Sequence, residues 1–165
     1  RDPLTLRVHD PLEYEPNVLI DTSWLYTWQE GQFVDVTPQY ADEYRARIDE
    51  IVAEIEPEYG MALSHTRPDF LKILLLANKA HLPYGQTLDT FLEVTNPDHW
   101  PGTSTMMTCW LQLGRAYAKR DAHTGRPFIL PPSGKTLNGP KLEDIVEGIN
   151  PGRYDITACQ QLVAP

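Results

Sequence analysis

The sequence predicts a mainly α fold, a single-domain bundle of four to five helices with extended, proline-rich arms at both ends. Two observations support this prediction. Apolar residues recur at helical spacing in several central segments, and 15 prolines cluster near the ends and between those segments. No repeat or linker divides the chain. We therefore expect one domain over residues 1–165, with an extended N-terminal arm (1–36), a helical core (37–150) and a C-terminal tail (151–165).

Residues 1–36 are expected to form an extended arm containing one or two short strands. The arm has scattered charges, two short apolar runs and three prolines, at positions 3, 11 and 16. Near its end lie three aromatic residues that we interpret as anchors of the arm, either on its own core or on a neighbouring copy: Trp24, Tyr26 and Trp28.

The clearest helix is expected from about residue 38 to residue 57. Thr37 is a suitable N-cap and Pro38 suits the first helical position. The segment then presents one apolar stripe, formed by Tyr44, Ile48, Ile51, Val52 and Ile55. A second helix over 70–82 is apolar on almost every side, so we place it at the centre of the bundle, with Thr66 or Asp69 as its cap.

Three further helices complete the predicted core. A short helix covers 86–95, and a longer one covers 103–121 with an apolar stripe ending at Tyr117. Gly125 and Pro127 are expected to end the longer helix. Residues 126–132 form a strand or an extended packed segment, and a last short helix falls within 139–152.

The charge balance restricts the function classes. The chain carries 23 acids and 14 Lys or Arg, a net charge of -9. This argues against a general nucleic-acid binder, because neutralising phosphates requires a basic surplus. No apolar run approaches the roughly 20 residues that span a bilayer, so we expect no membrane contact. The protein is expected to be soluble, and to lie inside a cell or a virion rather than to be secreted. Cys109 is expected to be a packed free thiol, although a disulfide with Cys159 stays open.

Opposite charges are concentrated in two parts of the chain. Residues 35–58 contain eight acids and two arginines, and residues 111–141 contain six bases and one acid. We expect an acidic interaction face at Glu50, Glu54 and Glu58, and a basic one at Arg115, Lys119, Arg120 and Arg126. Two such faces can join copies head to tail. They can also be ordinary solvated faces, meet within one subunit, or leave the basic face to bind phosphate.

The stretch NVLIDTSWLYTW, residues 17–28, resembles the first strand of PIN-type nucleases, in which an apolar run ends in Asp followed by Thr or Ser. The resemblance covers about ten residues and implies that Asp21 binds a catalytic metal at the end of a parallel strand. Two-metal chemistry needs several converging carboxylates. No later strand ending in Asp is evident after residue 60, so we interpret Asp21 as a cap or turn residue.

No other motif predicts chemistry. PPSGKT (131–136) lacks the first glycine of a phosphate-binding loop, and the five histidines are dispersed. His9, Asp10, Glu13 and Glu15 are expected to form a solvated acidic arm. We predict no catalytic residue, no metal and no cofactor.

These observations favour a non-catalytic structural or assembly protein that self-associates through its arms and its opposed charged faces. A viral capsid or nucleocapsid subunit is one concrete form. The expected partners are other copies of the chain or a related subunit, and any contact with nucleic acid is restricted to residues 115–126. Two alternatives stay open: a metal-dependent nuclease or hydrolase using Asp21, and a small-ligand or regulatory binding domain built around the tryptophans.

Overall fold

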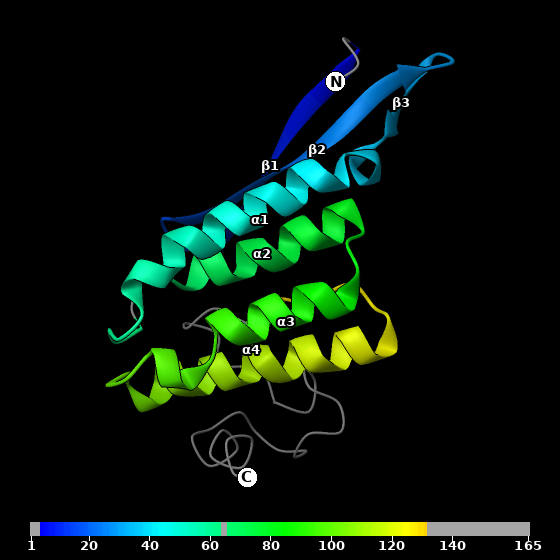
Figure 1. Cartoon of the computed structure of the whole chain (residues 1–165). Helices are drawn as coiled ribbons and strands as arrows, with labels where there is room; N and C mark the ends of the chain where they lie inside the picture. The colour runs from blue at the N-terminus through cyan, green and yellow to red at the C-terminus, as the bar shows by residue number, and fades with distance from the viewer. Residues whose placement is uncertain (1–3, 64–65, 132–165) are drawn as a thin grey trace.

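A computed structural model describes residues 4–63 and 66–131. The chain begins with a three-stranded antiparallel sheet in the order β1-β2-β3, formed by β1 (Thr5–Glu15), β2 (Val18–Gln29) and β3 (Gln32–Asp35). The first two strands make a long hairpin. Its open end and β3 project beyond the helices, as Figure 1 shows.

Two tight turns shape the sheet. Asn17 has a φ of 65° in the two-residue turn that joins β1 to β2. Glu30 and Gly31 have φ values of 49° and 82° between β2 and β3. Two positive φ values in a row are characteristic of a type I′ turn, whose twist matches that of the flanking strands. The Glu30–Gly31 turn therefore sets the register of β3 on β2.

Four α-helices follow the sheet and lie side by side in the order α1-α2-α3-α4 (Figure 1). Short 3-10 turns flank several of them. The helical elements are η1 (Thr37–Tyr40), α1 (Ala41–Ile55), η2 (Glu56–Glu58), α2 (Arg67–Ala80), α3 (Tyr84–Val94), η3 (Pro97–His99) and α4 (Thr105–Thr124).

The prediction of a mainly α bundle with an extended N-terminal arm is wrong. The described residues form an α/β fold, because most of residues 5–35 pair into a sheet instead of trailing as an arm. The sheet is an antiparallel meander. It therefore also differs from the parallel sheet that the resemblance to PIN-type nucleases implies. The predicted tail over 151–165 and the last predicted helix lie outside the described residues.

The helices themselves follow the predicted pattern closely. The stripe on α1 is buried at Tyr44, Ile48, Ile51 and Ile55, and Gly125 ends α4 in a left-handed conformation with a φ of 69°. The central position of α2 is also confirmed, since eight of its residues are buried.

Of the predicted helix caps, Thr37 is wrong, and Thr66 is correct in position but makes no side-chain capping bond. Thr37 does not cap the first helical segment, because its side chain is fully buried and bonded elsewhere. Its hydroxyl accepts a hydrogen bond from Leu25 N at 2.9 Å and donates one to Asp35 Oδ1 at 2.6 Å. Asp35 Oδ1 in turn accepts from Thr37 N at 2.9 Å. Thr66 is the N-cap residue of α2, as predicted, but its hydroxyl donates to Glu58 instead of accepting a hydrogen bond from the helix.

One hydrophobic core connects the helices with β2, and its largest fully buried side chains include Trp110, Tyr117, Phe70 and Phe91. Cys109 is buried in this core and takes part in a disulfide. The expectation of a free thiol is therefore wrong for Cys109, and Cys159 lies outside the described residues.

The segment after α4 is extended, as expected, and is fixed by two polar side chains. Asn78 donates to Phe128 O at 2.9 Å and accepts from Phe128 N at 2.8 Å, which imitates the pairing of a neighbouring strand. The fully buried carboxylate of Asp121 accepts from Ile129 N at 2.8 Å and from Arg120. In the described part of the chain, none of the helices has the length and apolar character needed to cross a membrane.

Candidate functional site

The sheet presents two faces, which we name by the parity of the residues in β1 and β2. From Thr5 to Glu13, strand pairing places even residues opposite even residues, as in Leu6 opposite Tyr26, and odd opposite odd, as in Arg7 opposite Leu25; the register shifts only before Glu15. Because successive side chains of a strand point to opposite sides, even residues share the even face and odd residues share the odd face. Phe33 pairs with Trp28 and so also lies on the even face.

In the half of the hairpin near its turn, residues 12–22, the even face of β2 packs against the helices, whereas Leu12 on β1 stays 39% exposed. Ile20 and Thr22 are buried there. Tyr14 OH accepts from Trp110 Nε1 at 2.8 Å and donates to Pro131 O at 2.9 Å. Burial raises the pKa of the Tyr14 phenol, so this hydroxyl keeps its proton and can donate. We call this part the tip half.

The other half of the hairpin, residues 4–10 with 23–29, buries the odd face instead. Ser23, Leu25 and Thr27 on β2 and Thr5 on β1 are buried. We call this part the open half. The buried side of β2 therefore changes between Thr22 and Ser23, without a bulge in that strand. We attribute the change to the twist of the long hairpin across the row of helices.

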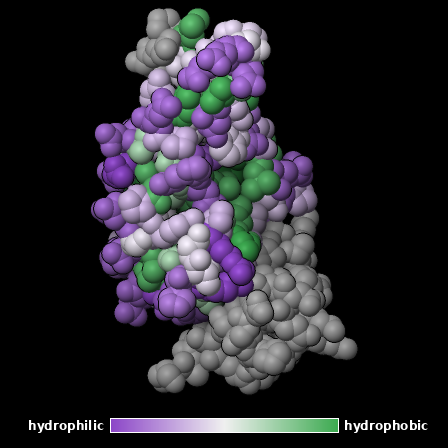
Figure 2. Space-filling model, turned by 90° about the vertical axis from the view of Figure 1, so that its right-hand side faces the viewer, coloured by the Kyte–Doolittle hydropathy of each residue, from purple (hydrophilic) through white to green (hydrophobic). Residues whose placement is uncertain are grey.

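The even face of the open half carries a cluster of exposed large apolar side chains, which we name the apolar patch. Leu4, Leu6 and Val8 are 59%, 49% and 44% exposed, and Trp28 and Phe33 are 49% and 54% exposed. The rings of Trp28 and Phe33 meet edge to face with centroids 4.9 Å apart. Figure 2 shows hydrophobic residues at the surface of the end where the sheet projects, next to hydrophilic ones. Several apolar side chains that usually form a core thus lie at the surface.

Trp24 lies at the boundary between the two halves and is engaged within the subunit. The Lys79 ammonium of α2 lies 4.6 Å from the centre of the Trp24 ring, and Trp24 Nε1 donates to Asp10 Oδ2 at 3.0 Å. Lys79 Nζ also donates to Asp10 Oδ2 at 2.5 Å and to Thr22 Oγ1 at 2.6 Å. The hydrogen bond from Lys79 holds the pKa of the Asp10 carboxyl below its ordinary value. Among the predicted anchors, Trp24 is thus fixed by its own subunit, Tyr26 is partly buried and Trp28 is open.

Asp21 is neither a cap nor a turn residue, so that interpretation is wrong. It lies in the middle of β2, on the odd face, with its carboxylate 3.6 Å from His9 Nδ1 and both side chains largely exposed. Within residues 4–63 and 66–131, no group of three or more His, Cys, Asp or Glu side chains could hold a metal ion. Of the acidic arm predicted at 9–15, Asp10 and Glu15 pair with Lys79 and Arg67.

The predicted acidic residues are largely engaged within their own subunit. Glu50 and Glu54 both accept from Arg47, at 3.0 and 3.4 Å, and Glu58 accepts from Thr66. Burial raises the pKa of nearby Asp69, and the charges of Glu54 and Glu58 raise it further.

The predicted basic residues separate into two pairs. Arg115 is half-buried, donates to Leu92 O at 2.6 Å and to Thr95 Oγ1 at 3.0 Å, and burial lowers its pKa. Arg120 donates to the buried Asp121. Lys119 and Arg126 are exposed.

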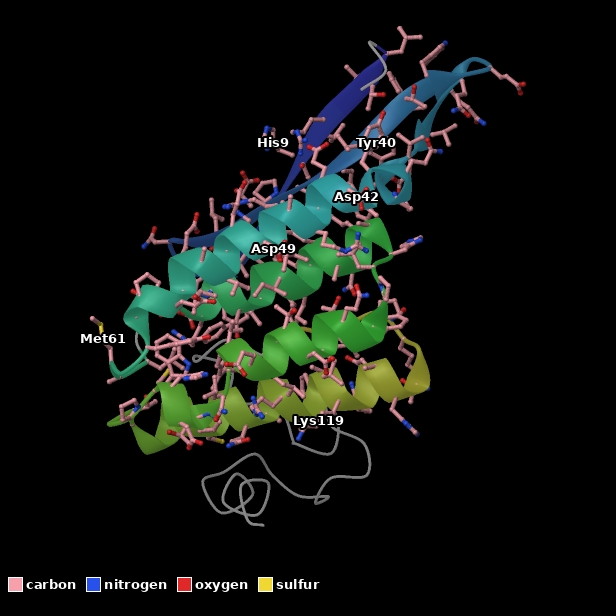
Figure 3. The ribbon with its side chains drawn as sticks, in the orientation of Figure 1. His9, Tyr40, Asp42, Asp49, Met61 and Lys119 are labelled. Carbon is pink, nitrogen blue, oxygen red and sulfur yellow. The ribbon has the colours of Figure 1, made fainter. Side chains whose placement is uncertain are left out.

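The acidic helix α1 and the basic helix α4 lie at opposite ends of the row of helices. Figure 3 shows this separation at the labelled residues Asp49 on α1 and Lys119 on α4. The structure therefore does not bring the two charged faces together within one subunit.

The sequence contains a strand pattern that predicts the apolar patch, but the interpretation of residues 1–36 as an arm does not use it. Leu4, Leu6 and Val8 alternate with the polar residues Thr5 and Arg7, whereas in β2 the apolar Leu25 interrupts the alternation of Trp24, Tyr26 and Trp28. Strict alternation over several residues is the pattern of a strand with one apolar face. Gly31, directly after the run that ends at Gln29, is a further turn signal, although Glu-Gly is not one of the dipeptides favoured in two-residue hairpins.

Comparison of the chain with protein-family models, with curated proteins and with solved structures finds no match.

Proposed function

We propose that this chain is a non-catalytic assembly protein that self-associates through the apolar patch, with the sheets of two copies packed face to face. The proposal rests on one observation, the exposure of five large apolar side chains on one face of the sheet. A sheet with a hydrophobic face is normally covered by another layer. Extended exposed apolar patches surrounded by polar residues are typical of interaction surfaces.

The size of the patch fits the centre of a specific interface. An aromatic side chain buries 150–250 Å² when fully covered, so Trp28 and Phe33 at half exposure leave roughly 200 Å² between them. Leu4, Leu6 and Val8 add to this area. A typical interface buries about 800 Å² on each partner, with an apolar core inside a polar rim. A second sheet of the same kind would supply a layer of matching size.

The distribution of charge favours a second copy at this surface. Two chains of net charge -9 repel each other over most approaches. The apolar patch contains no charged side chain, and the neighbouring Asp10 is neutralised by Lys79. Asp35, at the border of the patch, accepts hydrogen bonds from Thr37. Face-to-face contact therefore brings few unpaired acids together.

The edge of β1 favours a closed dimer over a growing fibre. β1 is an edge strand of the sheet and contains Pro11, which cannot donate to another strand. Arg7, His9 and Asp10 place charged or polar side chains along the same strand. Proline and charge are the usual means by which edge strands avoid pairing with other chains. Association through the face by a two-fold axis closes on itself.

Sedimentation velocity at rising protein concentration tests this proposal. Over about 1 to 500 μM, the range of weak specific interfaces, we expect the wild-type chain to shift from monomer to dimer. Trp28→Ser and Phe33→Ser should each keep the chain monomeric over that range. Leu19→Ser is the matched control, because Leu19 is 63% exposed on the same sheet but lies on the odd face, outside the patch. A monomer at every concentration, or a dimer that both patch variants preserve, would refute the proposal.

Salt distinguishes this dimer from contact between the charged faces. Salt screens exposed charges, whereas apolar burial is not weakened by it. We expect the dimer to persist from about 50 mM to 1 M sodium chloride, where the Debye length falls to about 3 Å. Dissociation at high salt would contradict association through the patch and would favour head-to-tail contact of α1 with α4.

A further inference from the structure

A pocket lies on the opposite side of the sheet from the apolar patch. It has a volume of about 440 Å³, is open to solvent on one side and is lined by residues of β1, β2, α1 and α2. Small-molecule sites commonly have volumes of 300–1,000 Å³. Its strand residues lie mainly on the odd face, so it shares no residue with the apolar patch. The inference drawn below is therefore independent of the proposed self-association.

The floor of the pocket is fixed by buried side chains and by hydrogen bonds between them. Leu76 of α2 and Tyr44 of α1 are buried there, next to Ser23 of β2. Tyr44 OH donates to Ser23 O at 2.6 Å, and Arg7 Nη1 donates to Ser23 Oγ at 2.7 Å. Burial raises the pKa of the Tyr44 phenol, which keeps this hydroxyl protonated. A floor held in this way is formed before any ligand arrives, which lowers the entropic cost of binding.

The rim of the pocket carries both signs of charge in equal number. Three carboxylates line it, Asp21, Glu43 and Glu50, and so do three Arg or Lys side chains, Arg7, Arg47 and Lys72, together with His9. This balance contrasts with the net charge of -9 for the whole chain. A lining of both signs suits a ligand that itself carries both signs.

Two rim charges are available for a ligand. Arg7 is paired with Glu43, and Arg47 is paired with Glu50 and Glu54. Lys72 forms no hydrogen bond or ion pair within residues 4–63 and 66–131, and its positive charge acts only at longer range on Asp69, where it partly offsets the rise in pKa that burial causes. Asp21 has only the 3.6 Å approach of His9, which is not a hydrogen bond at that distance. The available cation comes from α2 and the available anion from β2, with the apolar Leu76 and Ala46 also lining the pocket.

We propose that this pocket binds a small zwitterion whose opposite charges are separated by an apolar middle, such as a short peptide with free termini. The ligand's ammonium group contacts Asp21, its carboxylate contacts Lys72, and its apolar middle covers Leu76. Each charge of the ligand thereby meets a protein charge that forms no hydrogen bond to another side chain of the described residues. A ligand with one terminus blocked leaves either Asp21 or Lys72 without an opposite charge in the pocket.

Isothermal titration with four forms of one tripeptide tests the proposal. The probes are Gly-Leu-Gly with free termini, its N-acetyl form, its C-terminal amide, and the form with both ends blocked. We expect the free tripeptide to bind, and each blocked terminus to weaken binding about tenfold or more, as for the loss of a charge-assisted hydrogen bond. Equal affinity for all four forms, or no binding of the free form at ~10 mM, would overturn the proposal.

Two variants assign the charges to their partners. Lys72→Met should abolish the preference for the free tripeptide over its amide, and leave the preference over the N-acetyl form intact. Asp21→Asn should do the reverse. Lys119→Met is the matched control, because Lys119 is an exposed lysine on α4, away from the pocket. Preferences that persist in both variants would exclude these two residues as the contacts. Circular dichroism verifies that each variant is folded.

Discussion

The tip half and the open half of the β1–β2 hairpin belong to the same two strands but pack by opposite faces. In the tip half, the even face meets the helices, with Ile20 buried and Tyr14 bonded to Trp110. In the open half, the odd face is buried, and the even face leaves Trp28 half exposed. Even-face side chains of β2 thus pack in the core in the tip half and lie at the surface in the open half.

The difference shows that burial of an apolar strand residue depends on where the helices lie, not only on the strand's own pattern. Lys79 marks the boundary between the halves, since its ammonium bonds Asp10 and Thr22 and lies over Trp24. Beyond this boundary the hairpin projects past the helices (Figure 1), and its even face is exposed there at Leu6, Val8 and Trp28. The apolar residues there contribute little to the core, which leaves them available for a partner.

The largest expected effect is the difference in unfolding free energy between two truncations, one of an even-face residue in each half of the hairpin. Ile20→Ala removes a side chain that is 1% exposed, so it should lower the free energy of unfolding by about 2–5 kcal/mol. Leu6→Ala removes a half-exposed side chain and should cost less than about 1 kcal/mol. Urea denaturation at a concentration at which the chain is monomeric measures both. Equal costs would contradict the division into a packed and an open half.

Removing the charge of Asp10 should destabilise the fold more than removing the charge of Lys79. The Lys79 side chain is 5% exposed, whereas that of Asp10 is 51% exposed. Asp10→Asn leaves a buried ammonium without a counter-charge and should cost about 1–3 kcal/mol. Lys79→Met leaves an aspartate that can still reach water, and methionine fills much of the lysine's volume, so the cost should be about 1 kcal/mol or less. Urea denaturation near pH 7 compares them, and a larger cost for Lys79→Met would contradict this assignment of burial.

Acid should weaken the boundary in a defined pH window. The pKa of Asp10 is lower in the folded chain than its ordinary value of 3.8, mainly through the hydrogen bond from Lys79. A carboxyl with a lowered folded pKa stabilises the fold above its unfolded pKa and loses that contribution as pH falls through its folded pKa. The difference in stability between wild type and Asp10→Asn should therefore be constant from pH 7 to about 5 and shrink below about 4. A difference that stays constant down to about pH 2.5 would show that Asp10 does not titrate as described.

The helices could be predicted because each has a periodic pattern that local packing satisfies. On α1, Tyr44, Ile48, Ile51 and Ile55 recur at helical spacing and are all buried. The cap position at Thr66 could be predicted, but the one at Thr37 could not, because the Thr37 hydroxyl accepts a hydrogen bond from Leu25 N on β2. A residue that suits a cap locally can make a stronger set of bonds to a distant strand.

The sheet was missed because prolines and the mixed pattern of β2 masked its alternation. Pro11 suggested an arm, although proline is compatible with an edge strand. In β2, apolar residues occur at both parities, because Ile20 faces the core in the tip half and Leu25 faces it in the open half. A single-face pattern is lost when the buried face changes within one strand.

The candidate sites were predictable only in part. Trp28 was identified as a residue that could contact a neighbour, and it lies in the apolar patch. Asp21 was identified for a metal site, yet it lines a pocket of mixed charge. Lys72 had no distinguishing pattern in the sequence, because its role depends on α2 packing beside β2. Contacts between segments distant in sequence cannot be read from local spacing.

The smallest expected effect comes from placing one hydroxyl on the apolar patch. Val8→Thr keeps the shape of a β-branched side chain on a 44% exposed position, so the free energy of unfolding of the monomer should change by less than about 0.5 kcal/mol. Val36→Thr is the matched control, because Val36 is 2% exposed and a buried hydroxyl without a partner costs about 1–3 kcal/mol. The dissociation constant of the dimer should instead rise more for Val8→Thr than for Val36→Thr, because Val8 lies in the proposed interface and Val36 lies in the core. If Val8→Thr destabilised the monomer as much as Val36→Thr does, residues of the same chain would already cover the patch, and the open half would be as fully packed as the tip half.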